Sequence, residues 1–85
     1  MRIYMQTAAN ENQQPRFYQL HLGPDLFNGW MLTKEWGAQG SPGRVQKKHF
    51  LTPEEAEKAL MDARDQQIKR GYRVVFMEGQ PNPSS

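Results

Sequence analysis

The chain has 85 residues, 36% of them hydrophobic, with a mean hydropathy of -0.90 and a formal net charge of +2. This length accommodates one domain with one modest core, which leaves little apolar material to surround an elaborate active site and weighs against an enzyme. The chain has no cysteine, no apolar run of about 20 residues and no signal-peptide core, so we expect a cytoplasmic protein without disulfides, zinc fingers, iron–sulfur clusters or a membrane span.

The first half of the chain predicts two short strands separated by a polar loop. Residues 2–6 alternate weakly, and residues 7–15 show no apolar period. Residues 16–22 alternate clearly, with Tyr18, Leu20 and Leu22 on one face, as expected for a half-buried strand.

The next segments predict turns on either side of a third strand. Gly23-Pro24-Asp25 should end the second strand, and Asn28-Gly29 is typical of a two-residue turn. The third strand follows, with one face formed by Trp30, Leu32, Lys34 and Trp36.

A glycine-rich segment from Gly37 to Gly43 predicts the loop of a β-hairpin. Pro42-Gly43 fits the central positions of a type II turn, and residues 44–50 form the second arm. It is not a phosphate-binding loop, because no Gly-Lys-Ser/Thr follows and no helix begins there.

One helix is predicted over residues 53–70. Thr52 is the N-cap, Pro53 occupies the first helical position and Glu55 completes a capping box. Gly71 ends the helix in the left-handed conformation. The buried stripe is predicted at Ala56, Ala59, Leu60, Ala63 and Ile68, with outer i,i+4 ion pairs Glu54–Lys58 and Asp65–Lys69.

A final strand at 72–77 completes the order strands, hairpin, helix, strand. This order predicts an α+β fold, an antiparallel sheet of four to five strands with one α-helix packed on it. We expect a single domain over residues 1–78 and a disordered tail over 79–85.

The charges are unevenly distributed along the chain. The segments 44–48 and 69–73 are basic and contain no acid, whereas five of the nine acids lie between them, at Glu54, Glu55, Glu57, Asp62 and Asp65. If the basic segments meet in space, they form a positive patch backed by an acidic helix face. The alternative is a solvated surface of mixed charge.

No catalytic or metal-binding pattern is present. His21 and His49 are the only histidines, on separate predicted strands and without a carboxylate at ligand spacing. No serine or threonine lies in a nucleophile-elbow context. We therefore expect no enzymatic activity, no metal and no cofactor.

An ordered series of motifs resembles the WGR domain and covers about residues 16–76. It comprises Phe17-Tyr18-Gln19-Leu20-His21-Leu22, Asp25-Leu26-Phe27-Asn28-Gly29-Trp30, Glu35-Trp36-Gly37, Gly40-Ser41-Pro42-Gly43-Arg44-Val45, Glu54-Glu55-Ala56 and Lys69-Arg70-Gly71-Tyr72. The chain looks most like the short stand-alone WGR proteins of bacteria. The domain also occurs in poly(ADP-ribose) polymerases, where it is a sheet with one helix that binds DNA at strand breaks.

The resemblance implies a role for Trp36, since the signature tryptophan of the family packs against the terminal nucleotide. Ala38 stands where the family has an arginine, which removes a cation and five hydrogen-bond donors. Break-specific signalling is therefore not expected. General DNA or RNA affinity is, because Lys34, Arg44 and the lysines 47–48 lie beside the loop.

These observations predict a non-catalytic nucleic-acid-binding module with a Trp-Gly loop and an adjacent basic strand. The candidate binding residues are Trp36, Gly37, Lys34, Arg44, Lys47, Lys48 and Arg70. Lys47 lies on one strand face and Arg44 and Lys48 on the other, so one ligand cannot contact all three. Trp36 is either a stacking platform or a lid on the core.

Two aromatic residues are assigned to packing, and a second function stays open. Trp30 and Tyr72 are expected to pack in the core rather than contact a ligand. The alternative function is a protein–protein interaction adaptor that uses the same sheet and loop surface.

Overall fold

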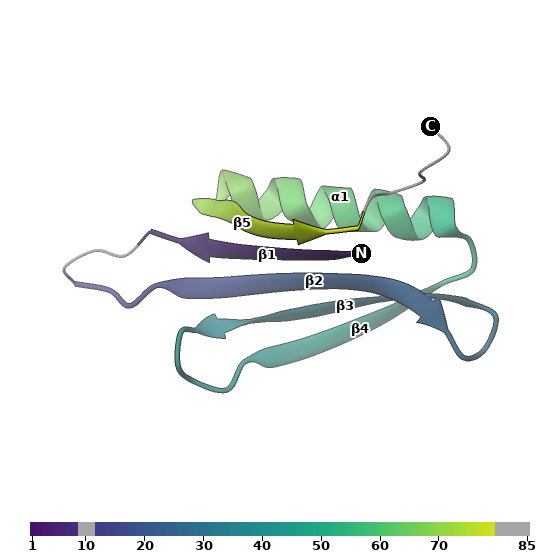
Figure 1. The fold of residues 1–85 in the computed structure, drawn as a ribbon, viewed down its shortest axis with the longest axis horizontal. Coiled ribbons are helices and arrows are strands. Elements are labelled where there is room, and N and C mark those ends of the chain that lie inside the picture. Colours follow the sequence, from purple (N-terminus) through teal and green to yellow (C-terminus); the bar gives the residue numbers. More distant parts are fainter. Residues whose placement is uncertain (9–11, 80–85) are drawn as a thin grey trace.

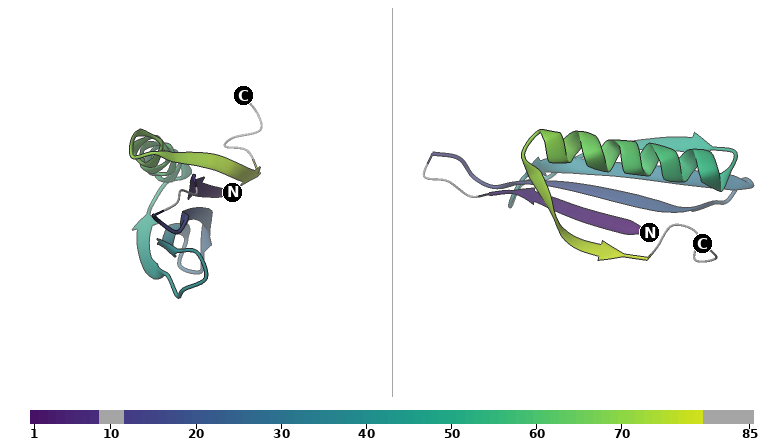
Figure 2. Two further views of the ribbon diagram at one scale, coloured as in Figure 1. Left: turned by 90° about the vertical axis from the view of Figure 1, so that its left-hand side faces the viewer. Right: turned by 90° about the horizontal axis from the view of Figure 1, so that it is seen from above.

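The computed structural model describes residues 1–8 and 12–79, which form an open five-stranded antiparallel sheet and one helix. The predicted tail beyond residue 79 and part of the predicted loop at 7–15 lie outside these residues. The strand order is β4-β3-β2-β1-β5, and α1 lies along one face of the sheet (Figures 1 and 2), which confirms the predicted α+β fold. The elements are β1 (Arg2–Thr7), β2 (Arg16–Asp25), β3 (Gly29–Ala38), β4 (Arg44–Phe50), α1 (Pro53–Lys69) and β5 (Tyr72–Glu78).

The core lies between α1 and the central strands. Strand alternation directs every second side chain of β1, β2 and β3 toward the helix, and small residues on α1 let it pack closely against them. Trp30 and Tyr72 are half-buried and pack against this core, as expected. The buried apolar residues are Ile3, Met5, Tyr18, Leu20, Leu22, Leu32, Ala56, Leu60 and Ala63.

The β2–β3 hairpin differs from the prediction at two points. β2 continues through Gly23 and Pro24 to Asp25, which pairs with Gly29. Met1 and Leu22 exchange backbone hydrogen bonds, and beyond them no described residue pairs with β2 on its β1 side, so the ring of Pro24 interrupts no ladder there. The connection has three residues rather than two, with Asn28 at φ 65°.

The β3–β4 loop turns at Gly40 rather than at Pro42-Gly43. The Ser41 N–H donates to the Ala38 carbonyl at 3.2 Å, and Gly40 has φ 83°, the value that a type II turn requires at its third position. Gly43 instead permits a close approach. A Cβ there would lie 2.8 Å from the Phe17 ring and 2.9 Å from the Trp36 carbonyl oxygen.

The helix begins where predicted and ends at Lys69, one residue earlier than predicted, with Arg70 as the C-cap. The Thr52 hydroxyl oxygen accepts from the Glu55 N–H at 3.2 Å, and Glu55 Oε1 lies 3.1 Å from the same hydroxyl. After Arg70, Gly71 has φ 101°, and its N–H donates to the Ile68 carbonyl at 3.1 Å. Both helix caps are therefore local features that follow directly from the residue types.

Two details of α1 were predicted wrongly. Ile68 is 45% exposed, and Gln67 takes its place in the buried stripe, because position 67 lies four residues after Ala63 and position 68 is rotated by a further 100°. The ion pairs observed on the helix are Lys58–Asp62 at 3.0 Å and Arg64–Asp65 at 2.9 Å, in place of Glu54–Lys58 and Asp65–Lys69.

Candidate nucleic-acid interface

A hollow of about 440 Å³ opens on the helix side of the sheet, where the C-terminal end of α1 passes over β2 and β3. We name it the aromatic hollow. Its lining residues come from five elements, β2, β3, β4, α1 and β5, and from the connection between α1 and β5. The lining residues are Arg16, Tyr18, Trp36, Gln46, Gln66, Gln67, Arg70 and Tyr72.

Three aromatic residues, Tyr18, Trp36 and Tyr72, line the aromatic hollow and contact one another. Tyr18 and Trp36 are register partners across β2 and β3, and their rings stack with centroids 5.8 Å apart at an interplanar angle of 17°. Tyr72 meets Tyr18 edge-on, also at 5.8 Å. Trp36 is half-buried, packs against the core and lines the hollow at the same time. It therefore covers the core and also presents aromatic surface to the hollow.

Two arginines provide the charge of the aromatic hollow. Arg16 begins β2 and Arg70 follows the last helical residue, and both are exposed. None of the described residues that line the hollow is acidic. A guanidinium group beside aromatic rings suits planar anionic ligands, because it pairs with phosphate in a bidentate manner and stacks on π-faces.

Burial raises the pKa of the Tyr18 hydroxyl above its ordinary value, and the nearby positive charge of Arg70 partly offsets this effect. Tyr18 is therefore neutral near pH 7.

The raised pKa of Tyr18 predicts a loss of stability in alkaline solution. Above a pH of about 10 the unfolded chain releases this proton more readily than the folded chain, so the free energy of unfolding should fall as pH rises toward the folded-state pKa. Below about pH 9 the contribution is fully present. Denaturant melts across this range should show a smaller decrease for Tyr18→Phe than for the wild type. Equal decreases in the two proteins would contradict the assignment.

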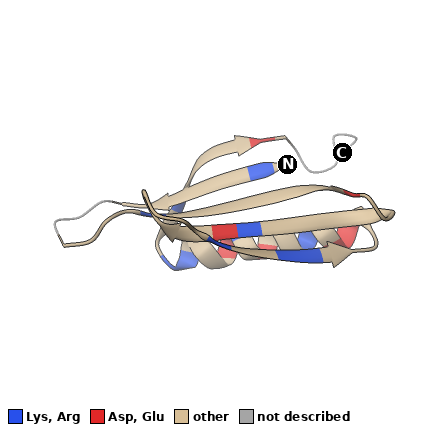
Figure 3. Cartoon of the chain, turned by 90° about the horizontal axis from the view of Figure 1, so that it is seen from below, with Lys and Arg blue, Asp and Glu red and all other residues tan. Residues whose placement is uncertain are grey.

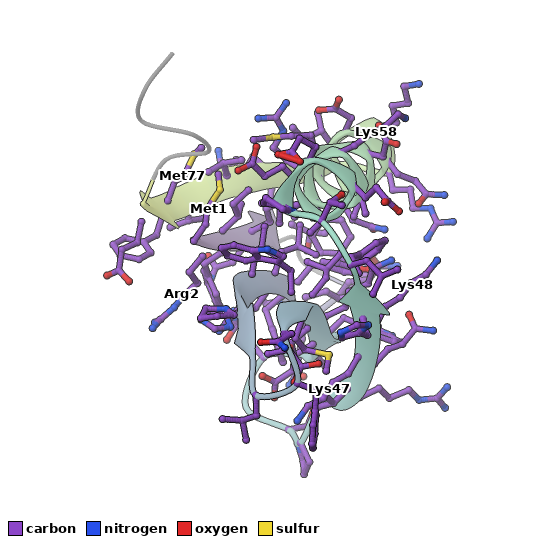
Figure 4. The ribbon with its side chains drawn as sticks, turned by 90° about the vertical axis from the view of Figure 1, so that its right-hand side faces the viewer. Met1, Arg2, Lys47, Lys48, Lys58 and Met77 are labelled. Carbon is purple, nitrogen blue, oxygen red and sulfur yellow. The ribbon has the colours of Figure 1, made fainter. Side chains whose placement is uncertain are left out.

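Strand β4 carries basic side chains on both of its faces. Arg44 and Lys48 pair with Trp36 and Leu32, so they share the helix-side face with the aromatic hollow, whereas Lys47 pairs with Thr33 and lies on the opposite face. Figure 4 shows Lys47 and Lys48 extending from β4 in different directions. The structure therefore separates these two predicted binding residues.

Lys34 and Gly37 lie near Trp36 in the sequence but on opposite faces of β3. Lys34 lies on the helix-side face, opposite Gln46. Gly37 belongs to the other face, where a Cβ would lie 3.2 Å from the Gly43 Cα and 3.5 Å from the Phe17 ring. Gly37 is explained by close packing of the hairpin, and the structure does not place it in the hollow.

The two basic segments meet only in part. Arg70 joins the aromatic hollow together with Gln46 of β4, whereas Arg73 pairs with Gln6 on the opposite face of the sheet. The helix surface is not uniformly acidic, since Figure 3 shows basic and acidic segments together on α1 and basic segments on β4. The hollow therefore gathers part of the predicted positive charge, whereas the rest of the surface carries charges of both signs.

The histidines have surroundings that the sequence did not indicate. His49 Nε2 lies 3.2 Å from Asp25 Oδ2, so a carboxylate does accompany this histidine, contrary to the expectation. Across residues 1–8 and 12–79, no three side chains of His, Cys, Asp or Glu gather in a way that could hold a metal ion.

Sequence reasoning identified Trp36 and Arg70 in the hollow and missed the other lining residues. Arg16, Gln46, Gln66 and Gln67 carry no recognisable motif. Tyr18 was recognisable in principle, because it shares a strand face with buried leucines and faces Trp36 once the hairpin register is known.

The fold and the hollow define a small α+β module of the binding type. The chain belongs to the WGR domain family, whose profile matches residues 1–78, and the WGR domain is a binding module of the nucleic-acid-binding type. No helix in the described part of the chain is long and apolar enough to cross a membrane.

The chain is similar to the uncharacterized protein y4dW of Sinorhizobium fredii (strain NBRC 101917 / NGR234). It is 32% identical over 72 residues, which make up 85% of this chain and 35% of the relative. The chain thus spans about a third of the length of that relative. No solved structure matches this chain significantly.

Proposed function

We propose that this protein is a non-catalytic module that binds DNA in the aromatic hollow. The observation that carries the proposal is the arrangement of Arg16 and Arg70 around the rings of Trp36, Tyr18 and Tyr72, without an acid among the described lining residues. Its family is one of nucleic-acid-binding type, which supports the same ligand class.

Each part of the hollow suits one part of a nucleotide. The guanidinium groups of Arg16 and Arg70 attract phosphate, and the exposed part of the Trp36 ring provides a stacking surface for a base. The amides of Gln46 and Gln66 offer both donors and acceptors to base edges or sugar hydroxyls. Stacking and phosphate contacts are tolerant of sequence, so we expect weak sequence preference.

The helix-side face of β4 extends the proposed binding surface. Arg44 is the register partner of Trp36, and Lys48 lies four residues further along the same face. At about 3.3 Å per residue this separation is roughly 13 Å, a distance that a strand of nucleic acid bridges with two nucleotides. Lys34 lies on this face as well. Lys47 and Gly37 are left outside the proposed site.

The residue at the family's arginine position narrows the proposed function. Ala38 stands at the family's arginine position, so contacts of that arginine to DNA or to other domains have no equivalent here. We propose a single domain over residues 1–78 that acts in the cytoplasm without cofactor or catalytic step, in line with the absence of cysteine.

A titration of labelled blunt, nicked and single-stranded DNA at two salt concentrations tests the proposal, with Lys48→Glu and Lys47→Glu as a matched pair. These neighbours are both exposed and lie on opposite faces of β4. Lys48→Glu should weaken binding and flatten the log–log salt slope by about 0.9 on duplex DNA, the value for one lost phosphate contact. Lys47→Glu should leave the slope nearly unchanged.

The outcome also separates the two functions that the sequence left open. Equal effects of the two variants would contradict a site on the helix-side face. Absence of salt-dependent binding to any DNA form would contradict DNA binding altogether and favour the protein-interaction adaptor.

A further inference from the structure

The two outer strands of the sheet differ in chemical character. β4 is a charged edge with Arg44 and two adjacent lysines, a composition that natural sheets use to prevent pairing with another chain. β5 is an apolar edge. Its four consecutive apolar residues are all exposed, with fractional exposures of 40% for Val74, 55% for Val75, 47% for Phe76 and 44% for Met77. Such an edge offers backbone groups and apolar side chains to a further strand.

The side chains of β5 alternate across a bulge. Val74 and Met77 pair with the core residues Met5 and Ile3 of β1, so they lie on the face of the sheet that the helix covers. The opposite face, which we call the open face, carries Arg73, Phe76 and Glu78. The register shift between Tyr4 and Met5 accommodates the extra residue Val75. Arg73 and Glu78 therefore lie on the same face although they are five residues apart.

This pattern makes β5 complementary to an antiparallel copy of itself. In the register centred between Val75 and Phe76, Arg73 lies opposite Glu78 of the partner subunit, and Val74 lies opposite Met77 of the partner subunit. Each pair occurs twice, and in each pair both residues belong to the same face of the sheet. The charges attract and the apolar residues cover one another.

We propose that β5 is the interface of a symmetric homodimer in which two copies join their sheets edge to edge. The five strands of each copy then form one continuous antiparallel sheet, and both helices, with both aromatic hollows, lie on the same face of it. Figure 4 shows Met77 of β5 and Lys48 of β4 on opposite sides of the molecule, so the dimer leaves the basic edge free.

Sedimentation or light-scattering measurements on the full chain test the proposal with two matched valine substitutions. Val75 on β5 and Val45 on β4 are both 55% exposed and both lie on outer strands. The wild type should form dimers at about 10–100 µM, a range typical of a small interface. Val75→Lys should raise the dimer dissociation constant by about tenfold or more, and Val45→Lys should leave it unchanged.

A charge exchange tests the register. Arg73→Glu and Glu78→Arg should each weaken the dimer, because each places like charges opposite one another twice. The double variant should restore dimerisation toward the wild-type level. It also loses the ion pair between Arg2 and Glu78, but this pair is exposed and 4.0 Å long, so its loss should have little effect on the dimer. Circular dichroism checks that each variant is folded.

Three results would overturn the proposal. These are a wild type that stays monomeric at about 100 µM, a Val45→Lys variant that dissociates as readily as Val75→Lys, and a double charge variant that dimerises no better than the single ones.

Discussion

Replacing Trp36 with alanine should weaken DNA binding by about 1–3 kcal/mol, the usual contribution of one base–aromatic stack. The same change should lower the free energy of unfolding by about 1–3 kcal/mol, less than the 3–5 kcal/mol of a fully buried aromatic residue. The reason is that Trp36 is half-buried, stacks on Tyr18 and still lines the aromatic hollow. Denaturant melts and DNA titrations of the same preparations measure both effects.

Trp30 supplies the matched control for this experiment. It is also half-buried and packs against the core, but it lies at the other end of β3, opposite Phe50. Trp30→Ala should therefore destabilise the fold by a similar amount while DNA affinity of the folded protein is retained. Trp36→Leu adds a second comparison, since leucine keeps apolar contact with the core and loses the stacking surface.

The comparison has one decisive result. A Trp36→Ala variant that is folded and binds DNA as the wild type does would end the stacking proposal and leave Trp36 as part of the core.

Removing both arginines of the aromatic hollow should have the next largest effect. Arg16→Gln with Arg70→Gln takes away two cations that we expect to contact phosphate, so the log–log salt slope on duplex DNA should flatten by about 1.8. Affinity should fall most at low salt, where phosphate contacts contribute most. Glutamine keeps a polar side chain of moderate length, so the fold should be little affected.

The control for the arginine variant is a double change on the other face of the sheet. Arg2→Gln with Lys47→Gln removes the same net charge from positions that face away from the hollow. Its salt slope should stay close to the wild-type value. If the two double variants behaved alike, binding would depend on net charge alone, and the aromatic hollow would not be the site.

Local features of the chain were predictable because short-range physics decides them. Thr52 and Gly71 mark the helix ends through hydrogen bonds and backbone conformations that involve only a few neighbouring residues. Alternation predicted the strands, and the order of elements predicted an antiparallel sheet with one helix. The family motifs, which are also a property of the linear sequence, indicated the class of protein.

The loops of the two hairpins and the last turn of the helix could not be predicted from residue type alone. Gly43 looked like a turn residue, but its neighbours Phe17 and the Trp36 carbonyl come from other parts of the hairpin. Ile68 looked like a core residue by type, yet the buried stripe of α1 continues from Ala63 to Gln67 and leaves Ile68 exposed. Pro24 looked like a strand breaker, and only the extent of β1 beside it shows that no hydrogen bond is lost.

By itself the sequence determined the number and type of the elements, the residues that cap the helix and the family, and it singled out Trp36 and Arg70, which both line the hollow. Only the tertiary structure decided that Arg16, Trp36 and Arg70 surround one hollow, because strand register and helix position bring together residues that are far apart in the chain. Alternation already placed Lys47 and Lys48 on opposite faces of their strand. Only the register with β3, which pairs Lys48 with the buried Leu32, decided that Lys48 lies on the face covered by the helix and Lys47 on the other.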